Sequence, residues 1–282
     1  MKILITGRNG QLGSELFDLQ ENNPQHQFVF VDRETMDLSN PDQITTVLEK
    51  EQPNIIVSAG AYTAVDKAES EQDVCDAINH LAVKTMAAWA AANNAKIIHI
   101  STDYVFDGTS EAPLKETDTP DPMNVYGFTK LQGEQALAAS GAAYVIIRTA
   151  WVYSTYGANF VKTMMRLMNE RDEISVVADQ VGTPTYARDL ALAIMKVIDA
   201  PEFVPGIFHF SNEGKISWYD FATAIKDLNG YQTTIHAIGS DAFPTPAKRP
   251  KFSLLDKSKI KEVYQVNVPE WYDSLKEMLA KV

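Results

Sequence analysis

Two residues with the chemistry for proton transfer, Tyr126 and Lys130, stand four positions apart in the segment "NVYGFTKLQGEQAL". A phenol titrates near pH ~10 and an ammonium near ~10.4, so neither group exchanges protons at neutral pH unaided. On a helix, four residues rise about 6 Å and return to nearly the same face, so both side chains can share one pocket. A neighbouring ammonium favours the phenolate, which predicts a lowered pKa for Tyr126. The pair could then protonate a carbonyl oxygen during its reduction, although the same spacing also arises by chance in solvated pairs.

A hydroxyl with the chemistry to assist this reaction follows the apolar run "KIIHIS" (96–101). Thr102 is the second residue of the segment "STDYVFDG" (101–108), at the carboxyl end of the strand that precedes the helix with the pair. In open parallel sheets the ligand crevice lies at the carboxyl ends of the strands. Thr102 is therefore expected to hydrogen-bond the same carbonyl oxygen. The alternative is that its hydroxyl only caps the end of the strand.

The elements that position these residues alternate regularly in the first half of the chain. Short runs rich in Ile and Val predict buried parallel strands at 2–6, 28–32, 54–60, 96–101 and 144–149. Amphipathic patterns between them predict helices at 11–20, 41–51, 71–93 and 124–139. This alternation predicts an α/β fold with a doubly wound parallel sheet of the Rossmann type.

The second half of the chain is less regular. The patterns predict helices at 158–171, 186–199, 217–228 and from 270, and strands at 174–177, 206–210 and 233–238. We therefore expect a dinucleotide-binding domain at 1–150. Residues 151–282 are expected to form mainly a smaller, mixed, substrate-binding lobe, with some elements returning to cover the sheet.

The composition narrows the class of protein. The net charge of −12 over 282 residues argues against a nucleic-acid partner. Cys75 is the only cysteine, which excludes an internal disulfide framework and fits a reducing compartment. The start "MKILITGRNG" is too short for a secretory core, and no apolar run has the length of a bilayer crossing. A cytoplasmic protein without a membrane partner is expected.

A glycine-rich loop, "GRNGQLG" (7–13), connects the first strand to the first helix. Gly7 would permit the tight turn, and Gly10 would let backbone amides approach a pyrophosphate. Gly13 would let the helix pack closely on the strand, with its positive N-terminal end facing the phosphates. Glycines alone also occur in ordinary turns, but the strand before and the helix after favour a dinucleotide site.

The residues at the end of the second strand leave the choice of dinucleotide open. Asp32 could accept hydrogen bonds from the adenosine ribose, as expected for NADH, whereas Arg33 and Arg8 could bind the 2′-phosphate of NADPH. We lean slightly toward NADPH, or the use of both dinucleotides. The alternative for Arg33 is a solvated loop charge.

Together these features resemble the extended short-chain dehydrogenase/reductase superfamily, and within it the dTDP-4-dehydrorhamnose reductase family. Besides the glycine loop, "STDYVFDG" and "NVYGFTKLQGE", the resemblance includes "AYTAVDKAE" (61–69), "RTAWVY" (148–153), "DQVGTPTYARDLA" (179–191) and "TPAKRP" (245–250). These motifs cover nearly the whole chain in the family's order.

The resemblance implies roles for further residues. It places Gly10, Gln11 and Leu12 at the cofactor pyrophosphate, Asp37 and Leu38 beside the adenine, Ala61, Tyr62 and Thr63 beside the ribose, and Ile100 behind the nicotinamide. It assigns Lys130 to the nicotinamide ribose, and Thr102, Asp103, Tyr126 and Trp151 to the sugar nucleotide, with Arg249 on its pyrophosphate. The alternatives are a core aromatic at Trp151 and a solvated loop around Arg249.

The implied reaction is reduction of the C4 keto group of dTDP-4-dehydro-β-L-rhamnose by NADPH or NADH, giving dTDP-L-rhamnose for surface polysaccharide. Some members of the family pair through Mg²⁺ held by acidic clusters. Glu15 is a possible remnant of such a site, but the C-terminus "KEMLAKV" gives it no acidic partner, so a monomer or homodimer without metal is expected.

Three other functions are alternatives to this reaction. The family of the 4,6-dehydratases is similar in scaffold but has a Thr-Asp-Glu arrangement at the end of the fourth strand. Here Tyr104 stands where the glutamate would be, and a tyrosine is a poor base at neutral pH, which disfavours dehydration. A nucleotide-sugar 4-epimerase of the same scaffold stays open. So does a non-catalytic NADP-binding module like the regulatory subunit of methionine adenosyltransferase, although such a module has no need of Tyr126 and Lys130.

Overall fold

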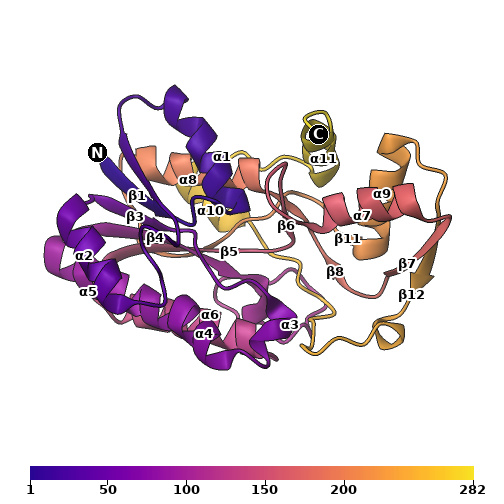
Figure 1. Cartoon of the computed structure of the whole chain (residues 1–282), viewed down its shortest axis with the longest axis horizontal. Helices are drawn as coiled ribbons and strands as arrows, with labels where there is room; N and C mark the ends of the chain where they lie inside the picture. The colour runs from indigo at the N-terminus through magenta and orange to yellow at the C-terminus, as the bar shows by residue number, and fades with distance from the viewer.

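A six-stranded parallel sheet forms the centre of the fold, in a computed structural model that describes residues 1–282 (Figure 1). The strand order is β10-β5-β4-β3-β1-β2. The strands are β1 (Lys2–Thr6), β2 (Gln27–Val31), β3 (Ile55–Ser58), β4 (Lys96–Thr102), β5 (Ala143–Thr149) and β10 (Gly206–His209). In this register Ile5 pairs with Phe30 on one side and Val57 on the other. The predicted doubly wound parallel sheet is confirmed.

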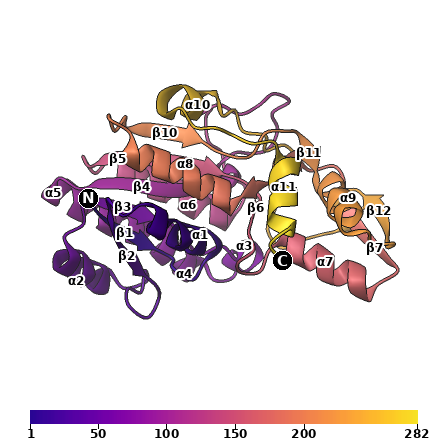
Figure 2. The same cartoon turned by 90° about the horizontal axis from the view of Figure 1, so that it is seen from above.

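Helices cover both faces of the sheet, because successive strand residues point to opposite sides. Ile3 and Ile5 pack in the core under α1 (Gln11–Leu19), α8 (Ala187–Asp199) and α10 (Ser258–Tyr264). Leu4, between them, packs in the opposite core under α2 (Pro41–Glu51), α5 (Ala82–Asn93) and α6 (Val125–Ala138). Figure 2 shows this layering from above, with α1 and α8 neighbouring each other on one face.

A second lobe, at the right of Figure 1, has its own core and three small two-stranded pairings. The pairs are β6 (Val152–Tyr153) with β9 (Thr185–Tyr186), β7 (Glu173–Val177) with β12 (Thr234–Ile238), and β8 (Val181–Gly182) with β11 (Ile216–Ser217). Its helices are α7 (Phe160–Glu170), α9 (Trp218–Asn229) and α11 (Trp271–Leu279).

Two elements from the second half of the chain belong to the central sheet. Strand β10 lies parallel to β5, with Phe208 opposite Ile147. Helix α8 packs against α1, and its Leu190 and Ile194 share the core of Ile3 and Ile5. The complete six-stranded sheet therefore includes residues from both halves of the chain.

The helix predicted at 71–93 is interrupted in the structure. It consists of α4 (Gln72–Asp76), a π-helical turn at Ala77–Leu81, and α5. The wider turn carries Asn79, whose amide accepts from Tyr62 N at 2.9 Å and donates to Tyr62 O at 3.0 Å. π-helical turns within α-helices are frequent at functional sites. Two more helices, α3 (Val65–Ala68) and α10, were not predicted.

None of the helices is long and apolar enough to cross a membrane; the longest, α6, has 14 residues.

Candidate active site

The glycine loop between β1 and α1 has the geometry of a phosphate cradle. Gly7 has a φ of 75°, and a Cβ there would lie 2.8 Å from the Cα of Gly60. A Cβ on Gly13 would lie 2.0 Å from the carbonyl oxygen of Gly7, so α1 packs on the loop at a distance that only glycine permits. No side chain caps α1, whose first residues are Gln11 and Leu12. Its N-terminal amides are therefore suited to bind an anion.

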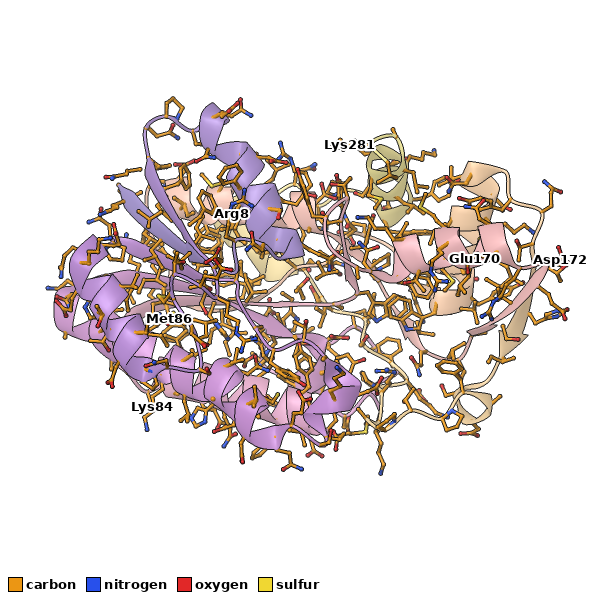
Figure 3. The ribbon with its side chains drawn as sticks, in the orientation of Figure 1. Arg8, Lys84, Met86, Glu170, Asp172 and Lys281 are labelled. Carbon is orange, nitrogen blue, oxygen red and sulfur yellow. The ribbon has the colours of Figure 1, made fainter.

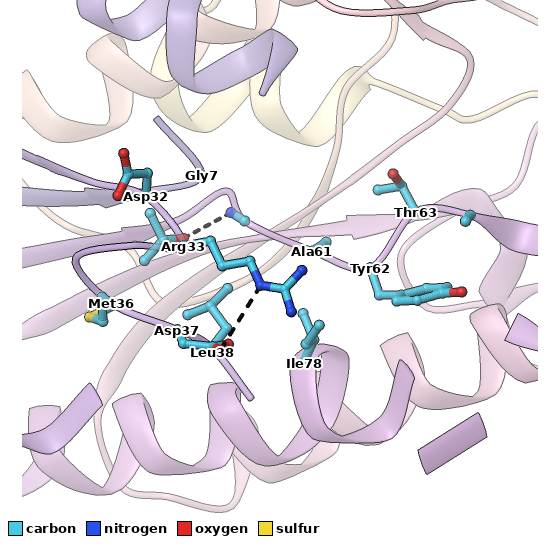
Figure 4. A pocket seen from close by; sticks show the side chains of 13 residues that line it. Gly7, Asp32, Arg33, Met36, Asp37, Leu38, Ala61, Tyr62, Thr63 and Ile78 are labelled. Carbon is cyan, nitrogen blue, oxygen red and sulfur yellow. Dashed lines mark hydrogen bonds and ion pairs between the residues drawn. The ribbon is translucent and has the colours of Figure 1, made fainter. Parts of the chain in front are cut away.

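A pocket of about 360 Å³ opens beside this loop, at the carboxyl ends of β1, β2 and β3 (Figure 4). It is lined by Thr6, Gly7, Asp32, Arg33, Met36, Asp37, Leu38, Gly60, Ala61, Tyr62, Thr63, Ala64 and Ile78. Eight of these residues were predicted from the sequence to bind the dinucleotide. The structure therefore brings the predicted adenosine-side residues together in one pocket at the carboxyl ends of the strands, the edge where ligands bind in open α/β sheets.

The two residues that bear on cofactor choice differ in how firmly they are held. Asp32 accepts hydrogen bonds from Thr35 and from the amide of Glu34. These bonds lower the pKa of its carboxyl, and those from Thr35 have the largest effect. Arg33 is 88% exposed and extends across the pocket toward Ile78, with Nε 4.0 Å from Asp37 (Figure 4). Its guanidinium is free to turn toward a phosphate.

Arg8, by contrast, is held away from the pocket. Its guanidinium carbon lies 3.6 Å from the centroid of the Phe17 ring, beside α1 (Figure 3). A cation over an aromatic face is attracted by the ring quadrupole. Arg8 therefore packs on the last turn of α1 and does not line the pocket, unlike Arg33.

Gln11 was predicted at the cofactor pyrophosphate, but its side chain is engaged elsewhere. Its amide donates to the Val152 carbonyl at 3.3 Å and accepts from Asn159 at 3.1 Å. These bonds tie the glycine loop to the second lobe. Only the backbone of Gln11 is left to face a phosphate.

Helix α6 carries the tyrosine–lysine pair, and several bonds fix where it begins. Asn124 caps it by accepting from the amide of Gly127 at 2.8 Å, and Glu69 accepts from the amide of Val125 at 3.0 Å. A Cβ on Gly127 would lie 2.1 Å from the Tyr104 carbonyl oxygen. The helix thus lies in direct contact with the segment that follows β4.

Tyr126 lies at the end of β4, with its ring 5.5 Å from that of Tyr104 in an edge-to-face arrangement. The prediction of a lowered pKa for Tyr126 is wrong for the chain without a dinucleotide. Burial raises the pKa of the phenol, against a smaller opposite effect of the Thr102 hydroxyl beside it. The physical reason is that removal from water disfavours the phenolate, and Lys130 directs its ammonium elsewhere.

Lys130 is only 2% exposed. Its Nζ donates to the Ile100 carbonyl at 2.6 Å and lies 3.3 Å from Nε2 of His99. Burial lowers the pKa of Lys130 to about 8, because the interior disfavours the charged ammonium. The backbone of Ile100 therefore contacts the lysine directly, on the strand that was predicted to lie behind the nicotinamide.

Thr102 and Asp103 form a buried, hydrogen-bonded pair of polar residues at the end of β4. The Thr102 hydroxyl donates to Asp103 Oδ1 at 3.0 Å and accepts from the amide of Tyr104 at 3.2 Å. Asp103 is 2% exposed, and its Oδ2 has no hydrogen-bond partner. Burial raises the pKa of Asp103 to about 6, while the hydroxyls of Ser253 and Thr102 oppose the shift. An unpaired buried carboxylate oxygen marks a position where a ligand hydroxyl would be favourable.

Arg249, from the second half of the chain, contacts the segment that follows Thr102 and Asp103. Its Nη2 lies 2.7 Å from Asp66 and its Nη1 lies 3.4 Å from the hydroxyl of Tyr104. Arg249 is therefore paired and half-buried, which contradicts the alternative of a solvated loop side chain. The loop is also held by Asn124, which donates to the Lys248 carbonyl at 2.7 Å.

Trp151 adopts a φ of 50°, which is unusual for a tryptophan. Its ring stacks on Trp218 with centroids 3.7 Å apart, and a Cβ on Gly182 would lie 3.1 Å from it. A backbone held in this region is frequent at binding sites. Trp151 is half-buried, so it is neither a fully enclosed core residue nor a free surface one.

Glu15 has no set of metal ligands around it. It is 3% exposed, accepts from Ser154 at 2.5 Å and lies 4.0 Å from Arg188. Burial raises the pKa of its carboxyl. The structure contains no group of three or more His, Cys, Asp or Glu side chains that could hold a metal ion. Nothing in the residues around Glu15 thus supports Mg²⁺.

Several residues at the site were not singled out from the sequence. Asp66 lay within a family motif without a stated role, and Asn79, Asn159 and Trp218 carried no local signal. His99 did carry one, as a polar residue inside the apolar strand β4. Only the three-dimensional arrangement reveals what these side chains contact.

Comparisons with known proteins agree with this geometry. The model of the RmlD substrate binding domain family matches residues 1–282. The dTDP-4-dehydrorhamnose reductase of Aggregatibacter actinomycetemcomitans is 40% identical over 99% of this chain and 98% of its own length. A crystal structure of a dTDP-4-dehydrorhamnose reductase from Clostridium acetobutylicum superposes with a TM-score of 0.95 at 42% identity, covering 100% of this chain and 99% of that one.

A structure of the Bacillus anthracis dTDP-4-dehydrorhamnose reductase in complex with NADP also has a TM-score of 0.95, at 38% identity and with 100% and 99% of the two chains covered. These relatives confirm the resemblance that was inferred from the motifs. The chain belongs to the family of the RmlD substrate binding domain, the family of the dTDP-4-dehydrorhamnose reductases.

Proposed function

We propose that this chain is an NAD(P)H-dependent oxidoreductase that reduces the C4 keto group of dTDP-4-dehydro-β-L-rhamnose to dTDP-L-rhamnose. The observation that carries the proposal is the convergence of three segments at the end of β4. Helix α6 brings Tyr126 against Thr102, and Arg249 arrives from the second lobe. The glycine loop lies at the same edge of the sheet, at the end of β1, which is separated from β4 by β3. A hydride acceptor bound here would touch a proton donor and a dinucleotide at once.

In the direction of reduction, Tyr126 must begin as a neutral phenol, because it gives a proton to the developing alkoxide. The raised pKa of the buried Tyr126 keeps this proton in place before the reaction. An alkoxide is a far stronger base than a phenolate, so the transfer is favourable once hydride has reached carbon. Thr102 would hydrogen-bond the same substrate oxygen. When bound, the reduced nicotinamide supplies the hydride.

Lys130 has two roles in this proposal. Its ammonium would hydrogen-bond the nicotinamide ribose and thereby orient the ring toward the sugar. The same positive charge would stabilise the phenolate that Tyr126 becomes after it has given up its proton. Its two bonds to β4 set the starting point from which the ammonium reaches the ribose.

The residues that would bind the dinucleotide lie at or after the carboxyl ends of the strands. Gly7, Gly10 and Gly13 with the backbone of Gln11 and Leu12 would hold the pyrophosphate of the dinucleotide. Asp32, Arg33, Asp37, Leu38 and residues 61–63 would surround its adenosine half. The exposed Arg33 supports a slight preference for NADPH.

On the substrate side, Asp103 would accept from a sugar hydroxyl through its unpaired Oδ2, and Trp151 would pack on the sugar nucleotide. Arg249 would bind its pyrophosphate, for which a planar, bidentate donor is suited. We assign residues 1–150 to dinucleotide binding and 151–282 mainly to the substrate, with β10 and α8 returning to the sheet.

The free, buried Cys75 is consistent with a reducing compartment, and we propose that the enzyme acts in the cytoplasm as a monomer or homodimer. The rival functions are the 4-epimerase of the same scaffold and the NADP-binding regulatory module. The retained Thr102, Tyr126 and Lys130 favour an enzyme over the module.

An absorbance assay at 340 nm tests the proposal, with dTDP-4-dehydrorhamnose and NADPH or NADH in parallel reactions. The expected result is stoichiometric loss of absorbance with formation of dTDP-rhamnose. A chain that binds the dinucleotide without consuming it would be the module. Interconversion of sugar nucleotides without net consumption would indicate the epimerase.

A further inference from the structure

A buried histidine, His99, contacts the active-site lysine from the middle of β4. It is 0% exposed, and its two ring nitrogens have different partners. Nε2 lies 3.3 Å from Lys130 Nζ, and Nδ1 lies 3.1 Å from the hydroxyl of Ser58 on β3. Of the side chains around Lys130, only His99 forms a hydrogen bond with Nζ; the other bond goes to the backbone of Ile100.

The partners determine the protonation of the ring. A lysine ammonium has only donors, so Nε2 of His99 must accept and therefore carries no hydrogen. The hydrogen of the neutral imidazole then resides on Nδ1 and is donated to Ser58. Burial and the positive charge of Lys130 both lower the pKa of His99, which keeps the ring neutral.

The other titratable groups that face Lys130 do not share this contact. Glu134, on the same helix, is occupied by Arg148, which lies 2.7 Å away in a bidentate pair. Cys75, on α4, hydrogen-bonds Thr129. Both act on Lys130 only through space. The direction in which the ammonium points is thus determined by β4.

We propose that His99 is a positioning residue, which holds the Lys130 ammonium with one hydrogen on the imidazole, one on the Ile100 carbonyl, and the third directed toward the nicotinamide ribose. Ser58 contributes by fixing the tautomer of His99. The inference rests on the proposed reductase function for its catalytic consequence, but the contact itself is independent of turnover. The alternative is that His99 only fills space between β4 and α6.

The variants His99→Leu and His99→Gln separate the two readings, because both fill the space and only glutamine offers an acceptor near the position of Nε2. We expect kcat to fall about tenfold or more in His99→Leu and KM for NADPH to rise, with KM for the sugar nucleotide nearly unchanged. His99→Gln should stay within about threefold of the parent in kcat. Thermal unfolding of all three proteins reports whether they fold alike.

Equal loss in both variants with unchanged unfolding would mean that packing is the only role, and parental rates in both would mean that the contact has no role. Either result overturns the proposal. Should His99→Leu fail to fold, the parent still decides the question by ¹⁵N NMR of its histidines. The expected spectrum has a bare Nε2 and a protonated Nδ1 for His99 at pH 7, and its pKa should rise in Lys130→Met. A hydrogen on Nε2 would overturn the proposal.

This measurement also keeps the two hypotheses apart. If the parent shows no reductase activity, the proposed function fails, whereas the NMR result still establishes or rejects the contact between His99 and Lys130.

Discussion

Arg249 and Asp66 form an ion pair between the two lobes, with Nη2 2.7 Å from Oδ2. Asp66 also accepts from the amide of Ala247 at 3.3 Å, so one carboxylate holds both the arginine and its loop. It lies in α3, three residues after Thr63, which is the last of the residues that we assign to the ribose of the dinucleotide. The arginine is therefore oriented before a sugar nucleotide arrives.

Replacement of Arg249 by alanine should raise KM for the sugar nucleotide about tenfold or more, because a charge-assisted pair with its pyrophosphate is lost. KM for NADPH should change far less. Steady-state kinetics with each substrate varied in turn measure both effects. Arg249→Lys is the matched control, since it keeps the charge without the bidentate geometry, and it should fall between the two. If both KM values rise together, Arg249 is structural.

Asp66→Asn should have a smaller effect of the same kind. The amide keeps an acceptor for Ala247 but loses the charge that orients Arg249, so we expect KM for the sugar nucleotide to rise about threefold to tenfold. Stability should change by about 1 kcal/mol or less, because the pair is partly exposed to solvent. The exposed Asp73 provides the control variant Asp73→Asn. An unchanged KM in Asp66→Asn would contradict the orienting role.

Tyr126→Phe should slow turnover by about 10²-fold or more while leaving the fold and NADPH binding nearly intact, because only the proton donor is removed. Fluorescence titration with NADPH and single-turnover kinetics measure the two properties separately. Tyr156→Phe, which removes a hydroxyl bonded to Asp18, is the control. Equal rates in Tyr126→Phe and the parent would refute the assigned role.

Gly127→Ala should reduce both stability and activity, although alanine favours helices. The new Cβ would meet the Tyr104 carbonyl oxygen at 2.1 Å, so α6 must move and carry Tyr126 with it. We expect a loss of about 1–3 kcal/mol in the free energy of unfolding and a lower kcat. Urea unfolding and the 340 nm assay provide both values. Gln135→Ala, on the exposed side of α6, should behave like the parent; unchanged kcat in Gly127→Ala would mean that the helix tolerates the shift.

Asp103 should make the stability of the chain depend on pH in the weakly acidic range. Its pKa is about 6 in the folded chain, above the ordinary value of 3.8, so the folded chain binds more protons than the unfolded chain between these pH values. The free energy of unfolding therefore falls as pH rises from about 4 to about 6, by on the order of 3 kcal/mol.

Asp103→Asn removes this titration and should be more stable than the parent at pH 7.5, but not at pH 4. Urea unfolding at both pH values measures the difference, with Asp73→Asn as the exposed control. Parallel pH profiles of Asp103→Asn and the parent would show that the buried carboxyl does not titrate in this range.

The elements that the sequence predicted best are those with local signals. Helix α2 begins at Pro41 as expected, because Asn40 accepts from the amides of Asp42 and Gln43. The alternation of strand and helix patterns likewise predicted the parallel sheet. The break in the helix at 71–93 had no local signal, since it depends on the contact of Asn79 with the backbone of Tyr62, seventeen residues earlier.

The electrostatics of the site could not be read from spacing alone. The spacing of four positions from Tyr126 to Lys130 predicted their common helix face, but the pKa of Tyr126 depends on how deeply the phenol is buried. The position of the ammonium depends on the register of β4, which places His99 under α6. Burial and register are properties of the assembled sheet.

The pairing of β10 with β5 has a consequence for synthesis on the ribosome. Until residues 206–209 have left the exit tunnel, β5 is the outermost strand of the nascent sheet, with unpaired amides and carbonyls along Val145–Arg148. An exposed apolar edge of this kind is prone to join other chains. A protein truncated before residue 206 is thus expected to aggregate, and the newly made chain depends on rapid completion or on a chaperone to shield that edge.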